Sequence, residues 1–172
     1  MTNYDWDDRE HPLAYFITIR TYGTWLHGDA RGSVERHGRN FYGTERIGLD
    51  PMFSAMMEEN MRNEPFLLDG PRRICVEHAI RSVCTVREYG LSALNVRTNH
   101  SHVVVSAAAG PKVVMNAFKS NATRELRECG LAAADQKVWS RGGSTRYLWK
   151  PTQLERAIEY TINGQGDDLP DF

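Results

Sequence analysis

The sequence predicts an α+β fold in which one antiparallel β-sheet carries helices on one face. The first observation is the order of the predicted elements, which runs β–α–β–β–α–β–α along the chain. The second is size and composition: 172 residues, of which 41% are hydrophobic and 25% charged, suffice for one domain with a full core. Because the chain has no internal repeat, we expect residues 1–172 to form a single domain.

The first predicted strand covers residues 13–20, which are rich in β-branched and aromatic side chains. A glycine-dense segment follows at about 21–70, and we expect a long irregular insertion there. Its one helical signal lies at 50–63, where Asp50 could cap a helix and Pro51 could occupy the first turn.

The remaining elements follow from periodicity and from glycine or proline at their ends. They are a helix over 72–90, strands over 91–97 and 100–107, a helix over 111–130, a strand over 137–149 that Gly142 and Gly143 could interrupt, and a helix over 151–164. This order is the split βαβ plan, also called ferredoxin-like or RRM-like, with one added C-terminal helix.

The charge is distributed unevenly along the chain, although the net charge is only −1. Residues 1–70 hold 7 basic and 12 acidic side chains, residues 71–150 hold 13 and 5, and residues 151–172 hold 1 and 5. A basic middle region is typical of a nucleic-acid-binding surface. We therefore expect these cations on the open face of the sheet and its flanking helices, with DNA affinity that falls steeply as salt rises.

Three cysteines follow no CxxC spacing, and their odd number argues against a disulfide framework. The acidic, polar start of the chain does not resemble a signal peptide, and no apolar run approaches the roughly 20 residues that a membrane helix needs. We expect a cytoplasmic protein without membrane contact.

The strongest chemical feature is the pair His100 and His102 on the predicted strand 100–107. Alternate side chains of a strand share a face, so the two imidazoles project together while Ser101 points the other way. Two fixed imidazoles form two corners of a metal site and need a third ligand from elsewhere. The alternative is one exposed histidine and one that is only hydrogen-bonded.

Tyr160 is the second feature, because it falls outside the apolar stripe of the last helix. That predicted inward stripe consists of Leu154, Ala157, Ile158, Thr161 and Ile162. At about 100° per residue, Tyr160 lies roughly 130° from the middle of the stripe. A role other than core packing, or simply an exposed amphipathic side chain, would account for it.

Together these features resemble the single-tyrosine HUH transposases, the IS200-like family, and in particular the branch called REP-associated tyrosine transposases. The resemblance rests on the His-x-His strand, the lysine- and serine-bearing helix after it, the tryptophan-containing strand and the helix with one tyrosine, and it spans about residues 13–166. It implies a single-strand DNA endonuclease and strand transferase. Such an enzyme uses Mg²⁺ or Mn²⁺ and forms a 5′-phosphotyrosine intermediate.

The resemblance assigns His100 and His102 to the metal and Tyr160 to nucleophilic attack. It suggests Gln165 as the third metal ligand, with Asn163 as the alternative, because the family position four residues after the tyrosine is Gly164 here. A second departure is Ser101, where the family usually has a bulky hydrophobic residue. The implied partner is single-stranded or hairpin DNA, and a homodimer, in which the tyrosine could serve the other copy's histidines, is also open.

Four basic side chains could line a DNA path: Lys119, Arg124, Arg141 and Arg146. A solvated helix face and a sheet core explain the same residues equally well. Arg146 precedes Tyr147 and lies near Trp149, a mixture of charge and flat rings that suits single strands.

Two other functions remain in competition. The main alternative is a non-catalytic or domesticated hairpin- or sequence-specific nucleic-acid-binding protein on an RRM-like fold, which would need neither the histidine pair nor Tyr160. A 2H-type phosphoesterase would need two separated His-x-Thr or His-x-Ser copies, and the chain holds only one tandem pair.

Overall fold

The computed structural model of the chain describes residues 11–24, 51 and 64–164. The predicted helix at 50–63 and most of the predicted insertion therefore lie outside the described residues. Within the described part, no helix has the length and apolar character that crossing a membrane requires.

Four strands form one antiparallel sheet: β1 (Ala14–Arg20), β2 (Gly90–Val96), β3 (His100–Ser106) and β4 (Ser144–Leu148). Their order across the sheet is β2-β3-β1-β4, so β3 lies between the two strands that the first crossover joins. This is the strand order of the split βαβ plan, and it confirms the predicted ferredoxin-like fold.

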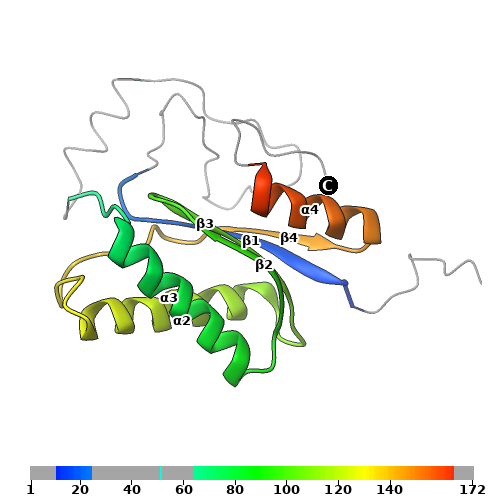
Figure 1. Cartoon of the computed structure of the whole chain (residues 1–172), viewed down its shortest axis with the longest axis horizontal. Coiled ribbons are helices and arrows are strands. Elements are labelled where there is room, and N and C mark those ends of the chain that lie inside the picture. The colour runs from blue at the N-terminus through cyan, green and yellow to red at the C-terminus, as the bar shows by residue number, and fades with distance from the viewer. Residues whose placement is uncertain (1–10, 25–50, 52–63, 165–172) are drawn as a thin grey trace, which may run out of the picture.

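Three helices cover the sheet, and they divide between its two faces (Figure 1). α2 (Gly70–Val86) and α3 (Pro111–Glu128) pack together on one face, and α4 (Pro151–Asn163) lies across the other. α4 begins where the sequence predicts, with Pro151 in its first turn. The Gln153 side-chain oxygen accepts the Lys150 backbone N–H at 3.0 Å, which satisfies one of the backbone groups at this end.

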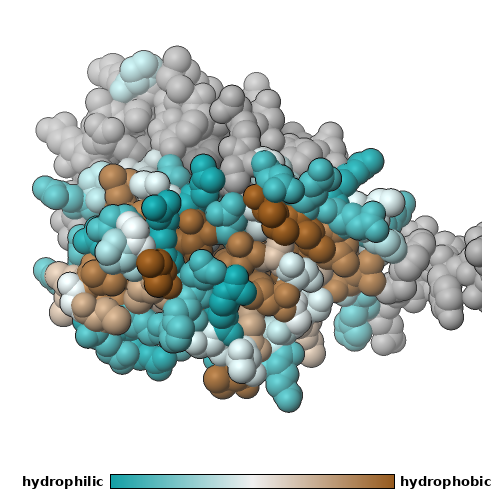
Figure 2. Space-filling view, viewed as in Figure 1, coloured by the Kyte–Doolittle hydropathy of each residue, from teal (hydrophilic) through white to brown (hydrophobic). Residues whose placement is uncertain are grey.

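The central strands are buried on both faces because helices lie above and below them. On β1, Ile17 and Ile19 join the larger core with α2 and α3, whereas Phe16 joins a smaller core with Val104 and Ala157 beneath α4. This two-sided burial explains the nearly continuous apolar composition of β1 and β3. Apolar surface is visible over α4 (Figure 2), and Ile162 on that helix is 57% exposed.

The first helix ends earlier than predicted, because the glycine that we expected to close it has another role. α2 stops at Val86, and Glu88 then adopts a left-handed conformation with φ of 56°. A residue in that region commonly ends a helix, although glycine usually occupies it. Gly90 is instead the first residue of β2, beside Ser106.

The last strand is shorter than the predicted 137–149, and the glycine pair explains the difference. β4 covers only Ser144–Leu148, while Trp139 makes one isolated bridge to Thr21. Gly142 has φ of 75°, and a Cβ at Gly143 would come within 2.4 Å of the Met115 sulfur. The pairing of β4 with β1 therefore does not extend past the two glycines, which the sequence had marked as a possible interruption.

Candidate active site

The two histidines share one face of the sheet, as strand alternation predicts. His100 begins β3 and His102 follows two residues later, and their ring centroids lie 4.7 Å apart. Across the β1–β3 ladder His100 faces Arg20 and His102 faces Thr18. Both histidines therefore lie on the central strand β3, where backbone pairing to β1 and β2 fixes the direction of their side chains.

His102 is held in a buried, mostly apolar setting. Its side chain stacks on Phe16 with centroids 5.2 Å apart, and its Nδ1 lies 2.9 Å from the Thr18 hydroxyl. Burial lowers the pKa of His102 to about 3, with further lowering by the positive charges of His100, Arg20 and Arg97. The ring is therefore neutral near pH 7, which is the form that binds metal ions.

His100 is less buried, and its protonation pattern follows from its neighbour. The Asn99 side-chain oxygen can only accept a hydrogen bond, so the His100 Nδ1 at 2.7 Å must donate. In a neutral ring this leaves the lone pair on Nε2. A hydrogen bond from the ring nitrogen that does not bind the metal is the usual way in which proteins orient a metal-binding histidine.

Tyr160 lies beside this pair in the same chain. Its ring centroid is 5.4 Å from that of His102 and 6.1 Å from that of Phe16. The predicted stripe of α4 was wrong at one position, because Ile162 is exposed while Tyr160 is half-buried at the edge of the packed face. The face that contacts the sheet is rotated toward Tyr160, which carries its ring over the histidines.

Asn95 ties α4 to the sheet, and sequence reasoning missed it. Its side-chain nitrogen donates to the Thr161 carbonyl oxygen at 2.9 Å, one residue beyond Tyr160. On β2 it is the register partner of His102, so it shares the face of the histidine pair. A polar residue at that alternating position of the 91–97 strand was the available signal.

Two arginines also went unnoticed in the sequence. Arg20 faces His100 across the ladder, and Arg97 precedes the hairpin turn with its backbone N–H bonded to the His100 carbonyl at 2.8 Å. Both carry a positive charge beside the pair, and these charges contribute to the lowered pKa of His102. Such charges favour ionisation of a tyrosine and binding of a phosphate.

The described residues leave the third metal ligand unassigned. A Cβ at Gly164 would lie 3.0 Å from both Cα and Cδ2 of Tyr160, so a larger residue there would push on that ring. Asn163 is exposed, and Gln165 lies outside the described residues. In the described part of the chain no three His, Cys, Asp or Glu side chains gather into a metal site. The histidine pair supplies two ligands that suit a divalent metal ion. Oxygen atoms from an amide, water or phosphate would have to complete the coordination.

Ser101 points to the opposite face, toward α2 and α3. It is fully buried between Ile19 and Val96 on the neighbouring strands, and its hydroxyl has no hydrogen-bond partner within the described residues. A buried hydroxyl without a partner costs stability. The departure from a bulky hydrophobic residue therefore affects the core behind the histidines, not the site itself.

The four basic side chains predicted along a DNA path do not lie on one surface. Lys119 and Arg124 line a cleft beside α3, and Arg141 lines a neighbouring one. Arg146 is the register partner of Phe16 on β4, so it belongs to the face that carries α4 and the histidines.

Comparison with solved structures gives the same architecture in a REP-associated tyrosine transposase bound to a REP hairpin. The alignment covers 95% of this chain and 72% of that one, with a TM-score of 0.51 and 14% sequence identity. The chain shares the fold of that transposase. A candidate transposase from Deinococcus radiodurans aligns over 92% of this chain and 94% of its own, with a TM-score of 0.49 and 13% identity. The sequence matches no protein-family model and no curated protein.

Proposed function

We propose that the protein cleaves and rejoins single-stranded or hairpin DNA, with Tyr160 as the nucleophile and His100 and His102 as metal ligands. The observation that carries this proposal is the 5.4 Å separation between the rings of Tyr160 and His102, which come from two different elements, α4 and β3. A protein that only binds nucleic acid has no need of that juxtaposition. The shared fold with a transposase supports the same reaction class.

The chain's own residues account for most of the chemistry. His100 and His102 would hold Mg²⁺ or Mn²⁺, which when bound neutralises phosphate charge and orients the phosphorus. A tyrosine phenol in water has a pKa near 10, so Tyr160 needs nearby positive charge to become a nucleophile. Arg20 and Arg97, whose charges act on the adjacent His102, would contribute it.

The proposed step exchanges one phosphoester bond for another. The Tyr160 oxygen loses its proton and attacks the phosphorus, and the bond from phosphorus to the 3′ oxygen of the upstream strand breaks. That 3′ oxygen takes up a proton and leaves as a hydroxyl, while the downstream strand remains joined to Tyr160 through its 5′ phosphate. Because the bond energy is retained, a 3′ hydroxyl can reverse the step without ATP.

A labelled hairpin tests this directly. With Mn²⁺ present, a 3′-labelled single-stranded hairpin should give a covalent protein–DNA band on a denaturing gel, whereas a 5′-labelled copy should give only a shorter free strand. Tyr160→Phe should abolish the band and retain hairpin binding. Tyr147→Phe is the matched control, since Tyr147 is 49% exposed on β4 and its side chain packs on Tyr15 instead. An undiminished band in Tyr160→Phe would reject the proposal.

The histidine pair has its own test. His100→Ala and His102→Ala should each lose cleavage at limiting Mn²⁺, because one imidazole holds a divalent ion poorly. Cleavage at the wild-type rate in either variant would show that the two do not act as a pair. Hairpin binding with no covalent band under any metal condition would favour the non-catalytic alternative.

Mixing two inactive variants tests whether Tyr160 acts within its own chain. A mixture of the Tyr160→Phe protein and the His102→Ala protein should remain inactive, because the tyrosine and the histidine meet in one chain. Recovery of the covalent band on mixing would instead mean that two copies exchange the α4 helix.

A further inference from the structure

We propose that a basic groove between α3 and residues 136–141 binds single-stranded DNA, separately from the histidine pair. The groove consists of two adjoining clefts of about 520 and 470 Å³, which share Thr123, Arg127 and Trp139 in their linings. The inference rests on the proposed function only for the choice of DNA as the nucleic acid.

The lining of the groove carries a clear excess of positive charge. Its basic members are Lys119, Arg124, Arg127, Lys137 and Arg141. Among the described residues its acidic members are Glu128 and Asp135, and Glu128 lies 3.8 Å from Arg124 in a loose ion pair. The three ion pairs in the described part of the chain do not involve Arg127. A phosphate backbone is the polyanion that such a lining complements.

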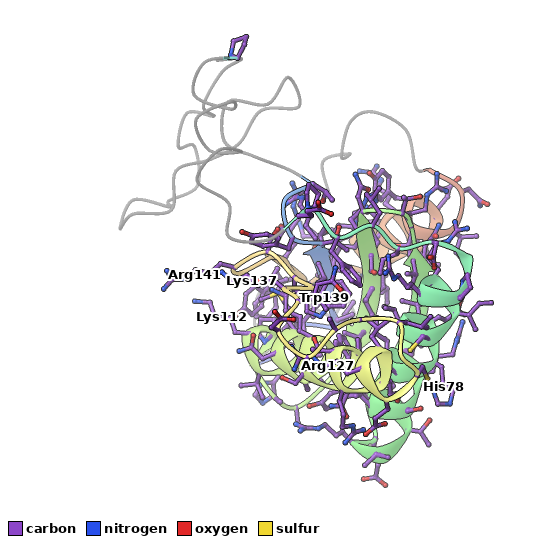
Figure 3. The ribbon with its side chains drawn as sticks, turned by 90° about the vertical axis from the view of Figure 1, so that its left-hand side faces the viewer. His78, Lys112, Arg127, Lys137, Trp139 and Arg141 are labelled. Atoms are coloured by element: carbon purple, nitrogen blue, oxygen red, sulfur yellow. The ribbon has the colours of Figure 1, made fainter. Side chains whose placement is uncertain are left out.

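Two lysines and one arginine of α3 recur along one side of the helix, together with a threonine. Lys112, Lys119, Thr123 and Arg127 recur at spacings of seven and four, which places them on the same side of the helix. At about 1.5 Å per residue this face extends roughly 22 Å. Figure 3 shows Lys112 and Arg127 from α3 on the same side of the molecule as Lys137, Trp139 and Arg141, with His78 of α2 farther away.

Trp139 is fixed at the centre of the groove. Its indole N–H donates to the Lys119 carbonyl at 3.1 Å and lies 3.0 Å from the Thr123 hydroxyl. The Lys119 ammonium in turn donates to the carbonyls of Ser140 and Gly142. These bonds hold the segment against α3, so Lys119 acts as a positioning residue and Trp139 presents a pre-ordered ring.

A fixed aromatic ring flanked by cations favours a single strand over a duplex. Bases of a single strand can stack on the ring while the phosphates meet the cations, and each stacked base contributes about 1–3 kcal/mol. Lys137 lies over the Tyr22 ring at 5.2 Å, which adds a second aromatic side chain to the lining. Paired bases in a duplex cannot stack in this way.

The groove is separate from the candidate active site. Trp139 packs against the larger core, on the side of the sheet that α2 and α3 cover. His102 and Tyr160 instead border the smaller core beneath α4. A strand held in the groove would therefore contact the protein at a second point, away from the bond that is cut.

The test uses the full-length Tyr160→Phe protein in EDTA, so that neither the nucleophile nor a metal contributes. Fluorescence anisotropy with an oligothymidine of about 12 nucleotides, a length within the range of small single-strand modules, gives the salt dependence of binding. Arg127→Ala with Arg141→Ala should weaken binding and reduce the slope of log K against log salt by about 1.4. Arg73→Ala with Arg87→Ala, two exposed arginines of the α2 region, should leave the slope unchanged.

Tryptophan fluorescence supplies a second measurement. Oligothymidine should quench the emission of the Tyr160→Phe protein, and most of this quenching should disappear when Trp139→Phe is added, with circular dichroism confirming the fold. An unchanged slope in the groove variant, equal losses in both arginine pairs, or equal competition by a blunt duplex would overturn the proposal. Because the assay excludes cleavage, failure to form a covalent band would not affect it.

Discussion

His102 and His100 are neighbours on one strand, yet the protein surrounds their rings differently. His102 is 4% exposed and stacked on Phe16, whereas His100 is half-buried and bonded to Asn99. The sequence predicted that the two rings share a face because that depends only on alternation. It could not predict the burial, since burial depends on Phe16 of another strand and on a helix that begins about fifty residues later.

The buried His102 predicts a pH-dependent stability. Its pKa is about 3 in the folded protein and near 6.5 when unfolded, so between these values the unfolded state binds more protons. The free energy of unfolding should therefore fall as pH falls from about 6.5 toward 3, by up to about 1.4 kcal/mol per pH unit. Urea denaturation of the metal-free protein should show this slope, reduced in His102→Asn. His11→Asn, at an exposed histidine, should keep the slope; equal slopes in all three proteins would contradict the prediction.

The choice of third metal ligand remains a prediction from the sequence. We expect Gln165→Ala to weaken Mn²⁺ binding more than Asn163→Ala, because glutamine has the longer reach and the helix ends between the two residues. The regular helical register favours Asn163 instead, which lies about 60° around the axis from Tyr160. A Mn²⁺ titration followed by electron paramagnetic resonance decides between them. A larger loss in Asn163→Ala would show that the helical register determines the ligand.

At the scale of elements, prediction succeeded where one local signal was sufficient. The valine run of β3 and the alternation around it located a central strand, and Pro151 located the start of α4. Prediction failed where the deciding contact was distant or unusual. The end of α2 depends on a left-handed Glu88, and the inward face of α4 depends on how that helix crosses the sheet.

The bond from Asn95 to Thr161 should matter more for catalysis than for stability. Asn95→Ala should lower stability by about 1 kcal/mol and slow formation of the covalent band about tenfold or more, because α4 is no longer held in register over His102. Asn121→Ala is the matched control, since that amide donates to a carbonyl within α3 at the same 2.9 Å distance. Comparable loss of the band in both variants would mean that the effect is merely structural.

At the scale of the whole molecule, the uneven charge pattern predicted a basic middle region, and its cations lie along a flanking helix more than on the open face of the sheet. The basic middle region was expected on the open face of the sheet and its flanking helices. α4 crosses that open face, and a cluster of cations lies along α3, one of the flanking helices, and residues 136–141. Strand order allowed either placement, because it does not say where a seventh element will pack.

Removing α4 should uncouple binding from cleavage and expose apolar surface. A chain that ends at Lys150 keeps the four strands β1 to β4 but uncovers Phe16, Val104 and Leu148, which α4 now shields. It should bind more of the dye ANS than full-length Tyr160→Phe does, retain oligothymidine binding, and form no covalent band. ANS fluorescence equal to that of the full-length variant would show that α4 adds little to the core.

The same anchoring limits how the proposed reaction could be completed. Ala157 and Thr161 are fully buried, and the Asn95 side chain donates a hydrogen bond to the carbonyl of Thr161, which ties α4 to the sheet. A DNA end attached to Tyr160 would therefore be immobile, because swinging the helix outward would expose Phe16 to water. The incoming 3′ end must travel to the phosphotyrosine instead. Target choice would then depend on the folding of the DNA, which brings its own ends together, more than on any movement of the protein.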